Sequence, residues 1–220
     1  MNNFYVLKPE GMMFGTKWAY GEIAKPDYTG DADQCPVCGA AVSMLRWLPP
    51  HRLKLSSAQP HKWGDFLWGA GFPLMVSNRF KMAYETTGLT GITHFYPPAE
   101  IVRVGKQKAG DLPRNLPEYS LVDILWNGAN LDDARSGALR KRMTCDFHRN
   151  AVEAIEHIVL EPGSWTGADV FEARGLPGRI LVSERFKDMV ESYNLKNVRL
   201  IPADKYAYDV HRPGGWYIRE

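Results

Sequence analysis

The three cysteines of the chain lie in two short motifs whose spacing suits a metal ion. The first motif is Cys35-Pro36-Val37-Cys38-Gly39, where two thiolates can converge and the glycine permits a tight turn after the second one. The second motif has Cys145 three positions before His148. Cys35, Cys38, Cys145 and His148 form a Cys3His set, which is a common ligand set for tetrahedral zinc. The sequence therefore predicts a zinc ion that links residues 35–39 to residues 145–148.

Other interpretations of these cysteines stay open. A Cys-x-x-Cys motif also occurs in thiol–disulfide oxidoreductases, at the start of a helix that follows a strand, but we do not expect a helix to begin at Ala40-Ala41-Val42. The three thiols could also be unrelated to one another. If all four predicted ligands bind, the zinc has no open position and is structural, whereas a site without His148 would be open for catalysis.

Catalytic motifs are not found elsewhere in the sequence. Gly69-Ala70-Gly71 begins like a dinucleotide-binding loop, but it lacks the third glycine and precedes a predicted strand. The segment from Gly163 to Gly167 does not match the nucleophile motif Gly-x-Ser-x-Gly. The remaining histidines are scattered along the chain. We therefore expect no catalytic residues and no enzymatic activity.

An aromatic cluster beside a glycine-rich turn is a candidate for partner binding. Trp63, Phe66 and Trp68 lie within six residues of one another, and large aromatic side chains are frequent at protein interfaces. The alternative is that these rings cover the core of the protein.

Two segments of the chain repeat one pattern of strand, helix and strand. Ser77 aligns with Ser183, and each serine is a suitable N-cap for the helix that follows it. Gly88 and Asn194 fall at the same point after the two helices, and both residues tolerate a left-handed backbone. We predict an internal repeat of residues 65–98 and 169–203. Its other identical pairs are Val76/Val182, Arg79/Arg185, Phe80/Phe186, Lys81/Lys187, Glu85/Glu191 and Leu89/Leu195.

The predicted fold is α+β and forms a single domain over residues 1–220. It contains duplicated strand–helix–strand units in a mixed sheet, together with a zinc-ribbon-like pair of knuckles. A further strand is expected at Glu100–Val104. Between the two repeats, Ser120–Leu125 and Leu131–Arg142 are candidates for short helices.

The composition limits the choice of function and location. The net charge of +2, from 27 basic and 25 acidic residues, is lower than expected for a nonspecific nucleic-acid-binding protein. The chain does not begin with a secretory signal, and it contains no apolar run long enough to span a membrane. Three cysteines are too few for a disulfide scaffold. We therefore expect a cytoplasmic protein that does not bind membranes.

The motifs together resemble those of a bacterial family. The relevant features are the early motif at 35–39, a distant second knuckle, Asp169-Val170-Phe171, the segment from Leu176 to Phe186, and Leu195-Lys196-Asn197-Val198. In these features the chain resembles the double-CXXCG family, whose members act as immunity proteins in polymorphic-toxin systems, and related immunity families. One departure is that the family's second motif is Cys-x-x-Cys-Gly, whereas this chain has His148 and Arg149 at its last two positions.

The resemblance implies that the protein binds and neutralises a cognate toxin protein. Two other functions remain open at this stage: a zinc-containing nucleic-acid-binding or regulatory protein, and a zinc enzyme with an open coordination site. A toxin gene immediately upstream would favour the immunity function.

Overall fold

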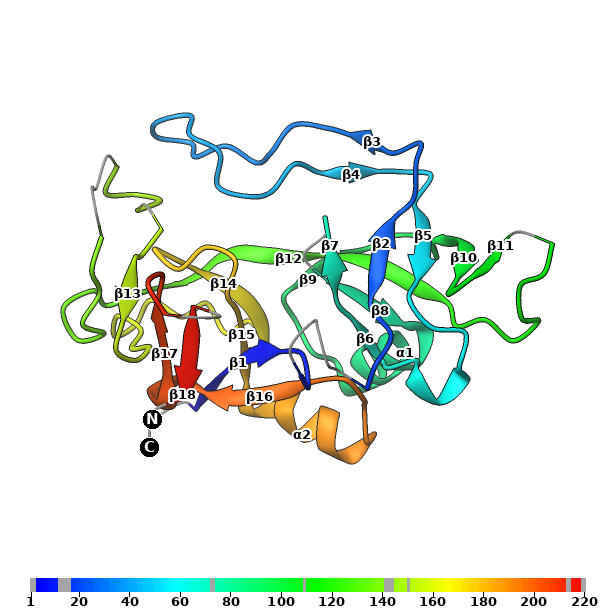
Figure 1. Ribbon diagram of the computed structural model, residues 1–220. Helices are drawn as coiled ribbons and strands as arrows, with labels where there is room; N and C mark the ends of the chain where they lie inside the picture. The colour runs from blue at the N-terminus through cyan, green and yellow to red at the C-terminus, as the bar shows by residue number, and fades with distance from the viewer. Residues whose placement is uncertain are drawn as a thin grey trace.

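The computed structural model describes residues 3–11, 17–71, 74–108, 110–140, 145–149, 151–212 and 215–218. The described residues form a mixed α+β structure, mostly of sheet, with two α-helices (Figure 1). This confirms the predicted class. No helix among these residues is long and apolar enough to cross a membrane. The helices are α1 (Asn78–Thr87) and α2 (Glu184–Ser192), and the strands are β1 (Phe4–Lys8), β2 (Gly21–Ile23), β3 (Tyr28–Thr29), β4 (Trp47–Leu48), β5 (Arg52–Leu55), β6 (Phe66–Leu67), β7 (Gly69–Ala70), β8 (Met75–Ser77), β9 (Ile92–Phe95), β10 (Glu100–Val104), β11 (Gln107–Lys108), β12 (Tyr119–Asn130), β13 (Ala154–Ile155), β14 (Val170–Arg174), β15 (Ile180–Ser183), β16 (Arg199–Pro202), β17 (Tyr206–Asp209) and β18 (Trp216–Ile218).

The largest sheet has eight strands in the order β16-β1-β15-β14-β12-β8-β6, with β9 also paired to β12. Its longest strand is β12, so the prediction of a short helix at Ser120–Leu125 is wrong. This segment pairs with β8, β9 and β14, and the sheet hydrogen bonds outweigh its weak local preference for a helix. The second expected helix, at Leu131–Arg142, is also wrong over its described part, residues 131–140, which forms turns and isolated bridges.

Both predicted helices begin where the sequence places them. Ser77 and Ser183 are the N-caps, and each hydroxyl accepts a hydrogen bond from the amide three residues later, at 3.1 Å and 3.3 Å. Gly88 after α1 and Asn194 after α2 both have a left-handed backbone, with φ of 61° and 49°. The expected strand at Glu100–Val104 is also present, as β10.

The strands around the two helices are paired in the same way. Strands β8 and β9 lie on either side of β12, and strands β15 and β16 lie on either side of β1, with every pair antiparallel. Each strand–helix–strand unit therefore encloses one strand from elsewhere in the chain. The origin of the two units by duplication stays a prediction.

Asp169 connects the second unit to the end of the first. Its buried carboxylate accepts hydrogen bonds from the hydroxyl of Ser183 at 2.6 Å, from Nη1 of Arg185 at 3.0 Å and from the amide of Thr90 at 3.0 Å. Nη2 of Arg185 lies 3.4 Å from the carbonyl oxygen of Gly88, at the end of α1. This places a positive charge where the helix dipole favours one.

Asp65 makes the equivalent contacts from the first unit to the end of the second. It accepts from the hydroxyl of Ser77 at 2.9 Å, from Nη1 of Arg79 at 2.8 Å and from the amide of Lys196 at 2.8 Å. Nη2 of Arg79 lies 3.4 Å from the carbonyl oxygen of Asn194, just after α2. In each unit, one buried carboxylate thus binds the loop that follows the helix of the other unit.

Three groups of buried side chains form the core. The first lies between the helices and the large sheet and includes Phe66, Phe80 and Phe186. The second includes Phe171 and Tyr206, from the large sheet and the small sheet β13-β17-β18. The third packs beneath the sheet β11-β10-β5-β2-β7. The main fold therefore has its own apolar core away from the cysteines.

Candidate metal centre

A long hairpin, residues 28–48, carries the first cysteine motif, and we call it the arm. Strands β3 and β4 form its base, and from there it crosses the top of the molecule in the view of Figure 1. Its two sides are joined by hydrogen bonds from the amide of Gly30 to the carbonyl of Arg46 and from the amide of Val42 to the carbonyl of Asp33. The arm therefore holds Cys35 and Cys38 far from its own base.

The first knuckle is a tight turn closed by its own backbone. The amide of Gly39 donates to the carbonyl of Cys35 at 2.9 Å, and the amide of Cys35 donates to the carbonyl of Ala40 at 2.8 Å. Gly39 has φ of 72°, in the left-handed region. A glycine is favoured at this position because a side chain there would be strained.

The second knuckle has the same backbone geometry without the glycine. The amide of Arg149 donates to the carbonyl of Cys145 at 3.1 Å, and Arg149 has φ of 53°. Its guanidinium forms an ion pair with Glu161 at 2.6 Å and also donates to the carbonyl of Leu131. The missing glycine therefore does not prevent the turn, because contacts of the arginine side chain hold the left-handed backbone in place.

The two knuckles bring all four predicted ligands together. Their ligand atoms lie within 4.8 Å of one another and could bind a metal ion. Sγ of Cys35 is 3.9 Å from Sγ of Cys145, and Sγ of Cys38 is 3.4 Å from Nδ1 of His148. With zinc–sulfur bonds of about 2.3 Å and zinc–nitrogen bonds of about 2.0 Å, a regular tetrahedron has edges of about 3.8 Å and about 3.5 Å. The two distances therefore fit tetrahedral zinc.

The electrostatic environment of the thiols is also that of a cation site. Burial opposes ionisation of Cys35, but hydrogen bonds from the amides of Cys38 and Val37 and contact with His148 lower the pKa of Cys35 to about 6. For Cys38, a hydrogen bond from the Ala40 amide favours the thiolate, but desolvation and the neighbouring thiols raise its pKa above the ordinary value. A bound divalent cation would remove this repulsion and favour all three thiolates.

A cavity of about 190 Å³ lies beside the second knuckle. Of the four candidate ligands, only His148 lines it. Sequence reasoning did not single out Trp126, since nothing in the apolar segment around it distinguishes this ring from a core residue. The other lining residues are Ala41, Val42, Arg149, Ala151, Ala173, Gly175 and Pro177. Ala41 and Val42 belong to the arm, so the cavity lies between the arm and the main fold.

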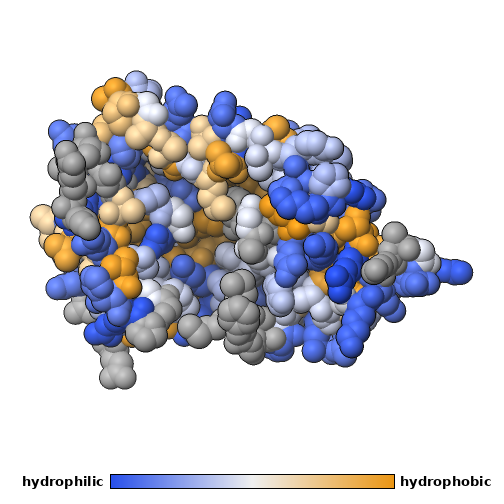
Figure 2. Space-filling model, turned by 45° about the horizontal axis from the view of Figure 1, so that its top comes forward, coloured by the Kyte–Doolittle hydropathy of each residue, from blue (hydrophilic) through white to orange (hydrophobic). Residues whose placement is uncertain are grey.

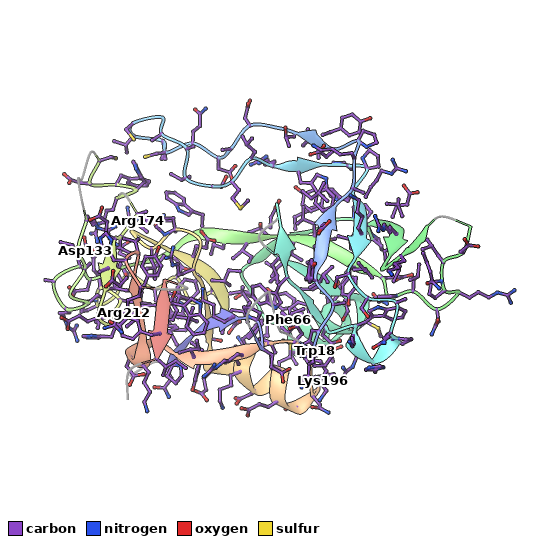
Figure 3. The ribbon with its side chains drawn as sticks, viewed as in Figure 1. Trp18, Phe66, Asp133, Arg174, Lys196 and Arg212 are labelled. Carbon is purple, nitrogen blue, oxygen red and sulfur yellow. The ribbon has the colours of Figure 1, made fainter. Side chains whose placement is uncertain are left out.

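The aromatic cluster predicted as a binding surface is mostly used within the protein. Phe66 is fully buried in the first core group, above Trp18 and Lys196 in the view of Figure 3, so its proposed role in partner binding is wrong. Trp63 and Trp68 are half-buried, and their indole N–H groups donate to the carbonyls of Ser57 and Asn197. A binding role for these two residues stays untested.

The arginines around the second knuckle have partners within the chain. Arg140 forms an ion pair with Asp133 at 2.7 Å, and Arg174 donates to Oδ1 of Asn130 at 2.6 Å. The guanidinium of Arg174 also lies 4.7 Å from the centre of the Phe147 ring. Asp133 and Arg174 both lie at the left of the view in Figure 3, beneath the tip of the arm. Arg174 therefore contacts the knuckle through Phe147, while Arg140 is paired with Asp133 beside it.

No family model matches this chain, and no curated protein matches it. The resemblance to double-CXXCG immunity proteins accordingly stays a prediction.

Proposed function

We propose that this protein binds a structural zinc ion and acts as an immunity protein, which recognises and neutralises a toxin protein in the cytoplasm. The observation that carries this proposal is the composition of the arm. Ten large hydrophobic side chains are exposed among the described residues, and five of them lie on the arm. They are Tyr28, Val37, Met44, Leu45 and Leu48. Exposed apolar side chains gathered on one element are typical of an interaction surface.

The zinc supports binding because it fixes the arm before the partner arrives. A hairpin tethered only at its base would lose conformational entropy when it binds, and this loss would weaken the complex. A metal bond between the tip and Cys145 restrains the arm at its far end. Figure 2 shows apolar side chains along the arm and a hollow beneath it, where part of a partner would fit.

The enzyme alternative is less well supported by the site. Catalytic zinc keeps one coordination position open for water or substrate. Here Cys35, Cys38, Cys145 and His148 offer four candidate ligand atoms, and two of the distances between them fit the edges of a zinc tetrahedron. If all four atoms bind the zinc, no position remains at which a zinc-bound water would react.

The nucleic-acid alternative is also less well supported. Binding to nucleic-acid phosphates requires cations that are free to displace the counterions condensed on them. Around the second knuckle, Arg140, Arg149 and Arg174 are instead engaged with Asp133, Glu161 and Asn130. The small net charge of +2 agrees with this distribution.

The proposal is tested by co-expressing the chain with the toxin encoded by the neighbouring gene. We expect the cells to survive and the two proteins to co-purify. A double variant, Met44→Ser with Leu45→Ser, should lose protection, whereas Met82→Ser on α1, at a methionine that is 62% exposed, should keep it. The absence of both protection and a complex would contradict the immunity function.

We also propose that the two strand–helix–strand units arose by duplication. The matching serine caps, the matching strand pairing and the reciprocal contacts of Asp65 and Asp169 support this origin. Urea unfolding of Asp65→Ala and Asp169→Ala tests whether the two units are equivalent, since equivalent units should lose similar stability.

A further inference from the structure

Lys8 is a largely buried cation without an acidic partner. It ends β1, on the same side of the strand as Val6 in the second core group. Its ammonium lies 5.4 Å from the ring centre of Tyr206 and 5.7 Å from that of Trp216. No carboxylate of the described residues lies within ion-pair distance of it. Because a buried charge is costly when it is unpaired, this position calls for a negative group.

A second cation, Arg179, lies close to Lys8. Burial and the Arg179 charge together lower the pKa of Lys8 to about 8. The guanidinium lies 4.0 Å from the ring centre of Tyr208 and donates to the carbonyl of Pro177 at 2.9 Å. It forms no ion pair with a carboxylate of the described chain. Since a guanidinium has five N–H donors, several of them remain available for a ligand beside the bond to Pro177.

The hydroxyl of Tyr206 is the third polar group at this position. Tyr206 is fully buried, and its hydroxyl has no hydrogen-bond partner among the described residues. Burial raises the pKa of Tyr206, while the Arg179 charge and the close approach of its side chain to the hydroxyl oppose the rise. A buried hydroxyl without a partner costs about 1–3 kcal/mol, so such groups usually indicate a missing water, ion or ligand.

An acidic side chain near Arg179, that of Glu172, does not satisfy these cations. Glu172 lies on β14, where burial raises its pKa although the Gly178 amide and the Arg179 charge act against this rise. Its carboxylate lies 3.4 Å from the Gly178 amide rather than in an ion pair with Arg179. Glu172 pairs with Ile180 of the neighbouring strand, so its side chain lies on the face of the sheet that carries the first core group. Lys8 lies on the opposite face.

We propose that Lys8, Arg179 and Tyr206 form a binding site for a phosphate-type oxyanion. The three groups come from β1, from the residue before β15 and from β17, and together they offer an ammonium, a guanidinium fork and a hydroxyl. This is the donor set that binds phosphate through charge-assisted hydrogen bonds. The rings of Tyr208 and Trp216 form the adjacent apolar walls. The proposal does not depend on the metal centre or on toxin binding.

The test uses the full chain and inorganic phosphate. Thermal unfolding and isothermal titration calorimetry at pH 7 are carried out with phosphate, sulfate or acetate, and with chloride at the same ionic strength as the reference. We expect phosphate to bind saturably and to raise the melting temperature beyond the chloride reference. A response to acetate but not to phosphate would assign the site to carboxylates and would overturn the proposal.

Three variants locate the binding. Lys8→Met should fold, because it replaces a desolvated cation by an apolar chain, and it should weaken phosphate binding by about tenfold or more. Tyr206→Phe should weaken it by about fivefold. Lys187→Met is the matched control, since Lys187 lies 5.9 Å from the Tyr5 ring centre but is paired with Glu184, and it should bind phosphate like the unmodified chain. Equal binding by Lys8→Met and the unmodified chain, or no saturable binding by the unmodified chain, would overturn the proposal.

Discussion

Removal of the Asp169 carboxylate should destabilise the protein more than its single ion pair suggests. In Asp169→Ala, the amide of Thr90 loses its acceptor, and this loss costs about 1–3 kcal/mol. The buried hydroxyl of Ser183 loses its partner at 2.6 Å, and we assign about 1 kcal/mol to that loss. The ion pair itself adds less than about 1 kcal/mol, because the Arg185 side chain is 60% exposed and stays hydrated.

The expected total is therefore a loss of about 3 kcal/mol in the free energy of unfolding. For a chain of this size, each kcal/mol corresponds to about 2–4 °C in melting temperature, so the shift should be about 6–12 °C. Urea unfolding followed by circular dichroism measures the free energy, and calorimetry measures the melting temperature. Arg185→Ala is the control, and it should cost less than about 1 kcal/mol.

The equivalent variant of the first unit provides a second comparison. Asp65→Ala removes the acceptor of the Lys196 amide, of the Ser77 hydroxyl and of Arg79, so its cost should agree with that of Asp169→Ala to within about 1 kcal/mol. The reasoning is refuted if Asp169→Ala costs no more than Arg185→Ala. A large cost for one aspartate and none for the other would contradict the equivalence of the units.

Three further predictions concern the second knuckle, the arm and Lys8. Arg149→Ala should be less stable than Arg149→Gly by about 1 kcal/mol in urea unfolding, because only glycine relieves the left-handed backbone while both variants lose the Glu161 ion pair; equal stabilities would contradict this. Cys38→Ser should speed hydrogen exchange in the arm but not in β1, β12 or β15, since the core groups lie away from the cysteines, and uniform acceleration would show that the metal holds the whole fold. In phosphate-free buffer, the stability of the unmodified chain relative to Lys8→Met should rise between pH 8 and pH 10.5. In that range the unfolded chain keeps the Lys8 proton that the folded chain has released, so a stability difference that is constant with pH would refute the pKa of about 8.

The sequence was most informative where one residue type determines local structure. The spacing of Cys35, Cys38, Cys145 and His148 predicted a cluster that the structure brings together. Serine caps and left-handed stops predicted the limits of α1 and α2, because these signals act within one helical turn.

The parts that could not be predicted depend on contacts between distant segments. The segment 119–130 becomes a strand because β8, β9 and β14 meet it along its edges, and its own sequence does not specify those neighbours. The role of Arg149 was hidden because the glycine that marks such a turn is absent. Lys8 and Arg179 are separated by most of the chain, so only the pairing of β1 with β15 reveals that they are neighbours.

The central claim is a structural zinc ion held by two knuckles, and its most direct test is the metal content of the purified protein. Protein prepared without chelators should contain about one zinc per chain by elemental analysis, and Cys145→Ser should contain much less. In the cobalt-substituted protein, the absorption spectrum should show tetrahedral coordination with thiolate ligands. A folded, unmodified chain without stoichiometric zinc would contradict the account.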